Sequence, residues 1–341
     1  MLTDSLFNEL IGEASLAPSA DNMQPWEFRK QNDTIEVYCA SSRALPTDVM
    51  NMFVWISIGA AIQNIILAAS KHGLEAGVAY YSIKKNKEPV AVITFKPGIK
   101  KKDIADFISS RCTNRSPFHS KPIEAEIIEK LNQFIQGFKA NIHWTTSAAD
   151  FDHIAYMDAH SSYIRLEHKP LHDELFSILR FTRKDMVKFR YGLTFESLDV
   201  PKFAVSFAKL LQYWSVNQMV SNLGIGRLVA KQLSNKLRAA GGICLITALE
   251  RNKIAYMEAG RAMEQFWLNA TALGLSVQPY GVLPQYLTKI DVEPETFLPK
   301  YVTELKKHRE PFYSIFPDAK NEFPAIVLRV GYTDKQSARS E

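Results

Sequence analysis

Cysteine is scarce in this chain, and its three residues form no motif. Cys39, Cys112 and Cys244 lie far apart in a sequence of 341 residues, and no CxxC pair is present. This number and spacing exclude a disulfide framework and a cysteine-based structural zinc site. They favour a protein of a reducing compartment.

Long hydrophobic runs are also missing. The most apolar stretch, residues 56–69, is shorter than a bilayer span and contains Gln63 and Asn64. It therefore predicts a buried core helix rather than a membrane helix. The first apolar stretch carries Asp4 and Glu9, which argues against a signal peptide. We expect a cytoplasmic protein with no membrane partner.

The lysines of this chain are not gathered into one basic stripe. The net charge is +5, and the lysines form separate clusters, such as those at 84–87 and 100–102. Solvated side chains explain this pattern better than a nucleic-acid partner, for which no recognition motif is present. Composition is ordinary for a globular protein, with 46% hydrophobic residues. The length exceeds that of one core, so two domains or two merged halves are expected.

Hydrophobic periodicity predicts a mixture of helices and strands. The two longest unbroken helices are predicted over 49–72 and 252–273, and Gly73 and Gly274 end them at the C′ position. Residues beyond Leu283 are expected to form proline-rich turns. Helices are predicted over 2–16, 49–72, 123–138, 150–183 and 252–273, and strands over 27–30, 35–39, 89–95, 142–145, 243–249 and 325–332.

Two further segments in the middle of the chain have alternative interpretations. Residues 202–238 are basic, aromatic and helical, which suits either a membrane-surface helix or a lid; a lid or packing helix is favoured, because its apolar residues can face inward. His168 and His172 have the i, i+4 spacing of paired metal ligands. Pro170 lies between them and no known zinc motif follows, so no metal site is predicted.

The two long helices share a pattern that predicts an internal repeat. Gly59, Ala61, Leu67, Ala69, Gly73 and Leu74 recur at a constant offset of 201 (260 − 59) as Gly260, Ala262, Leu268, Ala270, Gly274 and Leu275. Small residues on one helix face allow two helices to approach closely. We expect two homologous halves packed in a pseudo-twofold arrangement, as in a fused homodimer. Chance similarity between two Ala/Leu/Gly helices is the alternative.

Two polar segments carry groups that suit a ligand. Arg111 and Arg115 lie four residues apart with a threonine between them, and an arginine fork suits phosphate. The loop 17–28 holds amides and hydroxyls between two prolines, as a rigid cofactor site requires. Taken alone, the first segment is better explained as a polar linker with solvated arginines, and the second as a plain helix-to-strand connection.

Three motifs resemble those of the nitroreductase superfamily. APSADNMQPWEF resembles its APSxxNxQPW segment, RCTNRSPF its Arg-x-Ser/Thr-x-Arg/Lys phosphate arm, and GLSVQPYG its Gly-Leu-x-x-x-Pro-x-Gly turn beside the flavin. The two-half layout and the closing LRVGY…ARS resemble the Acg-type two-half NAD(P)H nitroreductases. The resemblance implies an α+β, nitroreductase-like fold, an internally duplicated pseudo-dimer whose halves (1–110 and 111–341) enclose FMN.

The resemblance also implies roles for individual residues. Arg111 and Thr113 would hold the phosphate and ribityl chain, and Arg115 would lie near the pyrimidine edge, where positive charge favours the reduced flavin. The tail has one arginine where Acg-type sequences often carry two. The implied FMN-binding residues are Pro18, Ser19, Ala20, Asn22, Gln24, Arg111, Cys112, Thr113, Arg115, Pro279, Tyr280, Gly281 and Arg339.

The function implied by the resemblance is that of an FMN-dependent oxidoreductase. NAD(P)H would reduce flavin N5 by hydride transfer, and a small electron acceptor such as a nitroaromatic or a quinone would follow at the same face. The flavin carries the chemistry, so no catalytic side chain is named. The alternative is a flavin-sequestering protein whose pocket is closed by a lid-like insertion at about 186–238. The chain would be a monomeric pseudo-dimer or a homodimer.

Overall fold

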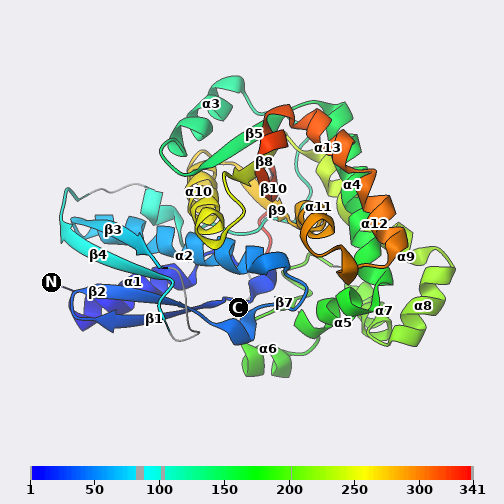
Figure 1. Ribbon diagram of the computed structural model, residues 1–341, viewed down its shortest axis with the longest axis horizontal. Coiled ribbons are helices and arrows are strands. Elements are labelled where there is room, and N and C mark those ends of the chain that lie inside the picture. Colours follow the sequence, from blue (N-terminus) through cyan, green and yellow to red (C-terminus); the bar gives the residue numbers. More distant parts are fainter. Residues whose placement is uncertain (1, 82–87, 101–103, 201, 339–341) are drawn as a thin grey trace.

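Two antiparallel sheets, each with its own long helix, organise the chain (Figure 1). The structure, a computed structural model, describes residues 2–81, 88–100, 104–200 and 202–338. The first sheet has the order β1-β2-β4-β3. The second has the order β5-β8-β10-β9. Their strands are β1 (Trp26–Gln31), β2 (Thr34–Cys39), β3 (Leu74–Tyr80), β4 (Ala91–Pro97), β5 (Ala140–Thr145), β8 (Gly242–Ala248), β9 (Ser276–Tyr280) and β10 (Phe323–Gly331).

The two sheets have the same topology. If the four strands of each sheet are numbered along the chain, their order across the sheet is first, second, fourth, third. In each, a long helix connects the second strand to the third. These helices are α2 (Met52–Lys71) and α10 (Lys253–Ala272). A shorter helix precedes the first strand of each sheet, α1 (Asp4–Ser15) and α3 (Ala125–Phe134). Mixed helices and sheets confirm the predicted α+β class.

The helices α2 and α10 pack against each other without intervening side chains. A Cβ built on Gly59 would lie 1.9 Å from the carbonyl oxygen of Met257, and one on Gly260 would lie 2.0 Å from that of Ile56. The offset that relates the two glycines also relates Ile56 to Met257. The contact is therefore repeated under exchange of the two helices, and glycine is needed at both positions.

A group of helices lies between β5 and β8, where the first sheet has only the β1–β2 hairpin turn. This segment is longer than the predicted insertion at 186–238. It contains α4 (Ala148–Glu167), α5 (Lys169–Ile178), α6 (Arg183–Phe189), α7 (Lys202–Leu211), α8 (Trp214–Asn222), α9 (Ile225–Ser234) and the paired two-residue strands β6 (Leu179–Arg180) and β7 (Leu193–Thr194).

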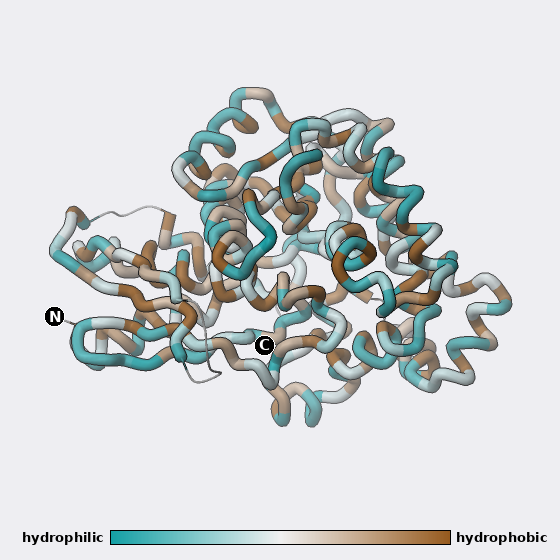
Figure 2. Tube along the Cα trace, in the orientation of Figure 1, coloured by the Kyte–Doolittle hydropathy of each residue, from teal (hydrophilic) through white to brown (hydrophobic). Residues whose placement is uncertain are grey.

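Three helices follow β9, where the sequence predicted turns. These are α11 (Val282–Val292), α12 (Pro299–Lys306) and α13 (Arg309–Ile315). The prediction was wrong because Pro284, Pro299 and Pro311 each lie in the first turn of a helix, where no backbone N–H is required. In Figure 2 the outer helices α4 and α12 alternate between teal and brown, as expected for helices that bury one face.

The helix α2 is long and apolar enough to cross a membrane by length and composition. However, 78% of the apolar window within residues 49–71 is buried inside the protein. Its neighbours are α10, α1 and β3. The stretch is therefore a core helix, as its length and its two amides predicted.

The glycine contact predicts a large loss of stability when a methyl group is added. We expect Gly59→Ala or Gly260→Ala to cost about 3 kcal/mol or more, because the new Cβ meets backbone that cannot rotate away. Urea unfolding measures the effect. Gly12→Ala is the matched control, since no atom lies within 4 Å of its Cβ position in α1. Equal stability of all three variants would contradict the packing described above.

Candidate functional site

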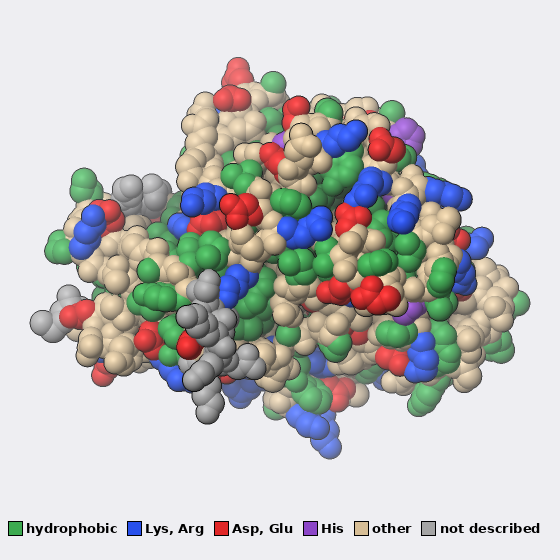
Figure 3. Space-filling view, in the orientation of Figure 1, with side chains coloured by type: hydrophobic (Ala, Val, Ile, Leu, Met, Phe, Trp, Pro, Cys, Tyr) green, Lys and Arg blue, Asp and Glu red, His purple; other side chains and the backbone are tan. Residues whose placement is uncertain are grey.

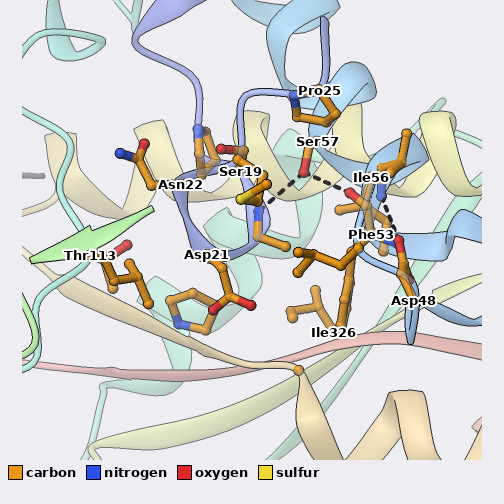
Figure 4. A pocket seen from close by; sticks show the side chains of 18 of the residues that line it. Ser19, Asp21, Asn22, Pro25, Asp48, Phe53, Ile56, Ser57, Thr113 and Ile326 are labelled. Carbon is orange, nitrogen blue, oxygen red and sulfur yellow. Dashed lines mark hydrogen bonds between the residues drawn. The ribbon is translucent and has the colours of Figure 1, made fainter. Parts of the chain in front are cut away.

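A cavity of about 300 Å³ lies between the elements of the two sheets. Its walls come from the loop 15–25, the loop 43–48 with the start of α2, the segment 111–115, and the turn from β9 into α11. Further residues come from α4, α5, β7 and α10. Its volume is at the lower end of the range of small-molecule pockets. Figure 4 shows side chains around this space from the first sixty residues, such as Ser19 and Phe53, and from later segments, namely Thr113 and Ile326.

The structure brings together most of the residues that the sequence analysis singled out. They come from three segments, residues 18–22, 111–115 and 279–281, that are far apart along the chain. The following line the cavity: Pro18, Ser19, Ala20, Asn22, Arg111, Cys112, Thr113, Arg115, Pro279 and Gly281.

Three predicted residues are not among those that line the cavity. The Gln24 amide instead donates to the Arg190 carbonyl at 3.0 Å. Tyr280 follows Pro279 on β9, and alternation along the strand turns its ring toward the second hydrophobic core. Arg339 lies outside the described residues, although its neighbour Ala338 lines the cavity.

The loop after α1 is held in a tight conformation against α2. Asp21, Asn22 and Gln24 have positive φ angles of 50°, 55° and 49°. The Ser19 hydroxyl accepts from the backbone N–H of Gln24 at 3.0 Å. The Ser57 hydroxyl accepts from the Ala20 N–H at 3.2 Å and donates to the Phe53 carbonyl (Figure 4). This loop is therefore pre-organised, as its density of polar groups predicted.

Arg111 is held by a buried acid and an aromatic ring. Its Nε lies 3.4 Å from Oε1 of Glu264, its guanidinium stacks 4.6 Å from the Trp267 ring centre, and Nη2 donates to the Leu16 carbonyl at 2.8 Å. Arg111 is 5% exposed and Glu264 is fully buried. The guanidinium is thus fixed at the cavity wall before any ligand binds. No sequence signal pointed to Glu264.

Arg115 is the second guanidinium of the segment 111–115. Burial lowers its pKa, even though the Asp21 carboxylate opposes this effect. Its Nη1 donates to the Ser197 carbonyl at 2.8 Å, and its backbone N–H donates to the Ser337 hydroxyl at 2.7 Å. An anionic group in the cavity would offset the cost of burying this charge.

Two more arginines, which the sequence analysis missed, border the cavity. Arg165 of α4 pairs with Asp21 at 3.2 Å. Its pKa is raised: burial lowers it, but Asp21 and the other groups outweigh that effect. Arg43 donates to the Gln24 carbonyl at 3.0 Å. Both lie in segments without a motif, so only the folded chain could reveal them.

Residues 190–192 are hydrogen-bonded to the loop 15–25 at one edge of the cavity. The Asn22 amide donates to the Gly192 carbonyl at 3.1 Å, and the Gly192 N–H donates to the Asn22 carbonyl. The Gln24 amide contacts Arg190, as described above, and Leu193 lines the cavity. Two side chains that the resemblance assigned to the flavin therefore hold a cover in place. We call residues 190–199 the cover.

Asp48 caps the start of α2 beside the cavity. Its carboxylate oxygens accept from the backbone N–H groups of Phe53 and Val54, each at 3.1 Å. Burial raises its pKa to about 7, against the opposite effect of these two donors. A carboxyl group that changes charge near neutral pH therefore lines this cavity.

The site as a whole suits an anionic ligand with an apolar body. Four arginines surround the cavity, against the three carboxyl groups of Asp21, Asp48 and Glu174. Phe53, Trp267 and Ile326 supply apolar surface. Among the described residues, no group of three His, Cys, Asp or Glu side chains could hold a metal.

Comparison with known proteins gives distant similarities. No family model matches the chain. An uncharacterized protein of Mycobacterium tuberculosis is 22% identical over 277 residues, which is 80% of this chain and 38% of that protein. The chain thus spans well under half the length of the curated relative that it matches.

Solved structures of nitroreductases are also similar to the chain. A Bacteroides fragilis nitroreductase with bound FMN is 11% identical, with a TM-score of 0.38, over 71% of this chain and 94% of that one. The FMN-dependent nitroreductase NfnB of Mycobacterium smegmatis, in complex with NADPH, is 12% identical, with a TM-score of 0.39, over 68% and 88%.

The raised pKa of Asp48 predicts a pH-dependent difference in stability. A carboxyl group whose pKa is raised on folding stabilises the protein when protonated, and this contribution is lost as pH rises through about 7. From about pH 5 to about pH 9, wild type should lose on the order of 2 kcal/mol relative to Asp48→Asn. Urea unfolding at each pH measures the difference. The exposed Asp318→Asn serves as control, and a constant difference for both variants would contradict the assignment.

Proposed function

We propose that this chain binds FMN in the cavity and acts as an NAD(P)H-dependent oxidoreductase of the nitroreductase type. The observation that carries the proposal is the convergence of three distant motifs on one cavity. Ten residues assigned to FMN by resemblance border the same space of about 300 Å³. A small electron acceptor and a cytoplasmic location belong to the same proposal.

The residues of the cavity fit FMN by charge and by shape. Arg111, already oriented by Glu264, and Thr113 would hold the phosphate end. Arg115 would face the anionic edge of the ring, which offsets the burial that lowers its pKa. A Cβ on Gly281 would lie 2.6 Å from the tip of the Phe53 ring, so a larger residue in the turn beside the cavity would displace that ring. When bound, FMN supplies hydride transfer through N5; the chain positions it and limits the access of water.

We further infer that the chain is an internally duplicated pseudo-dimer with halves 1–110 and 111–341. Identical strand order in the two sheets and the repeated glycine contact between α2 and α10 support this. The loop of the first half and the arm of the second each supply one side of the cavity. One complete FMN site per chain follows from this arrangement.

A second candidate function is sequestration of flavin. The observation that favours it is the cover, which Asn22 and Gln24 bind through their amides and which Arg115 binds at Ser197. A cover that stays in place would keep NAD(P)H from the flavin while still holding it. Both functions predict bound FMN. They differ in whether NAD(P)H can reduce it.

Removing Arg111 should release most of the bound flavin. A hydrogen bond to a charged group contributes about 1.5–3 kcal/mol, so affinity should fall roughly 10- to 100-fold. Because Arg111→Ala alone removes the guanidinium that faces the buried carboxylate of Glu264, we combine it with Glu264→Gln. Flavin absorbance of the purified protein measures occupancy, and circular dichroism checks the fold.

Glu264→Gln alone, which keeps Arg111, is the matched control and should retain FMN. A folded double variant with unchanged occupancy would overturn the role of Arg111. A colourless wild-type protein that takes up no added FMN would overturn the proposed function itself.

Anaerobic mixing with NADPH separates enzyme from sequestering protein. If the chain is an oxidoreductase, flavin absorbance should bleach rapidly on mixing. Flavin that dithionite reduces but neither NADPH nor NADH reduces would favour sequestration. Gly192→Ala loosens the cover, because a Cβ there would lie 2.4 Å from the Ile178 carbonyl oxygen. Faster reduction in this variant would identify the cover as the barrier.

A further inference from the structure

Helices α7, α8 and α9 expose an unusual share of the large hydrophobic side chains. Among the described residues, fifteen such side chains are exposed, and seven of them lie within residues 207–233. Leu223 is 71% exposed and Leu228 is 66% exposed. We call this set the outer helical face: Phe207, Leu210, Tyr213, Met219, Leu223, Leu228 and Leu233.

The inward-facing residues of these helices form a different set. Leu211, Val220 and Ala230 are buried. The helices α8 and α9 pack against α4, α8 also contacts α5, and α7 packs against α8. Inward packing is the reason predicted above for the apolar character of this region. That explanation holds for these residues and leaves the outer helical face without a partner within the described chain. Figure 3 shows hydrophobic side chains at the rim where α7 and α8 lie.

The stretch of sequence that carries the outer helical face contains charged residues of one sign only. No Asp or Glu occurs between Asp199 and Glu250, a stretch that contains six Lys and Arg residues. Arg238 pairs with Asp152 and Lys236 with Asp199, and Glu167 lies near Arg227. Lys209 and Lys231 are exposed, and neither forms an ion pair with any described residue. Cations therefore remain available beside the apolar side chains.

We propose that the outer helical face binds the surface of an anionic lipid bilayer. Interfacial helices combine exposed Leu, Phe and Met with Lys and Arg, and acidic lipids attract such segments. A second copy of the chain is a poorer partner, because a symmetric contact would place this cationic face against itself. Lys209 and Lys231, which are exposed, are instead complementary to acidic headgroups.

The same region is continuous with the cavity described above. Lys236, just after α9, donates to the Arg115 carbonyl at 2.6 Å and pairs with Asp199 of the cover at 3.4 Å. Binding of α7–α9 to a bilayer would thus bring the cover close to the membrane surface. The proposal itself depends on the outer helical face and not on the cofactor.

Co-sedimentation of the full-length protein with lipid vesicles tests the proposal. The vesicles contain phosphatidylcholine alone or phosphatidylcholine with phosphatidylglycerol, at low and high salt. We expect binding to the anionic vesicles, weakened by salt. Lys209→Gln with Lys231→Gln should weaken it about 25-fold, or roughly fivefold per charge. Leu223→Gln with Leu228→Gln should also abolish most binding.

Matched controls lie on distant exposed surfaces. Lys130→Gln with Lys320→Gln removes two exposed charges elsewhere, and Phe134→Gln removes an exposed ring on α3. Neither should change vesicle binding. The proposal is overturned if anionic vesicles do not bind, if zwitterionic vesicles bind equally well, or if the control variants lose binding to the same extent. A lipid-free dimer that Leu223→Gln with Leu228→Gln dissociates would also overturn it, in favour of a second copy.

Discussion

The close approach of α2 and α10 is the contact on which the rest of the structure depends. Gly59 and Gly260 bring the backbone of each helix against a carbonyl of the other. Each helix also contacts its own sheet, so the crossing fixes how the two sheets face one another. The cavity lies along this junction and takes residues from the start of α2 and from α10. The shape of the cavity therefore depends on the packing of these two helices.

Around the cavity, charged side chains are fixed by partners before a ligand arrives. Glu264 and Trp267 orient Arg111, Asp21 pairs with Arg165, and Ser197 accepts from Arg115. Burying such charges costs stability unless they are paired. Fixed charges need little reorganisation when a charged ligand binds. The free energy needed to bury and orient these charges is therefore supplied when the protein folds and not when a ligand binds.

Much of the fold and part of the site could be predicted from the sequence. The two long helices were predicted over 49–72 and 252–273 and span Met52–Lys71 and Lys253–Ala272. The agreement is close because helix periodicity and a C-terminal glycine are both local signals. Motifs identified ten cavity residues for the same reason. Glu264 and Arg165 were missed because their neighbours in space are distant in sequence. Asn22 and Gln24 hold the cover, which local pattern could not show, since the cover comes from a separate insertion.

The helices α7–α9 illustrate a further limit of sequence patterns. Apolar residues recur on both sides of these helices, and periodicity alone cannot say which side meets the protein. Inward packing accounts for one side. The exposure of the other became visible once the helices were placed against α4.

Because α2 and α10 belong to one polypeptide, their contact forms at an effective concentration set by the chain that connects them. In a site shared between two separate subunits, dilution separates the walls and releases what they hold. Here both walls remain together at any protein concentration. The cavity is therefore as intact in a dilute cell extract as in a concentrated sample, and its affinity for a ligand carries no cost of assembly.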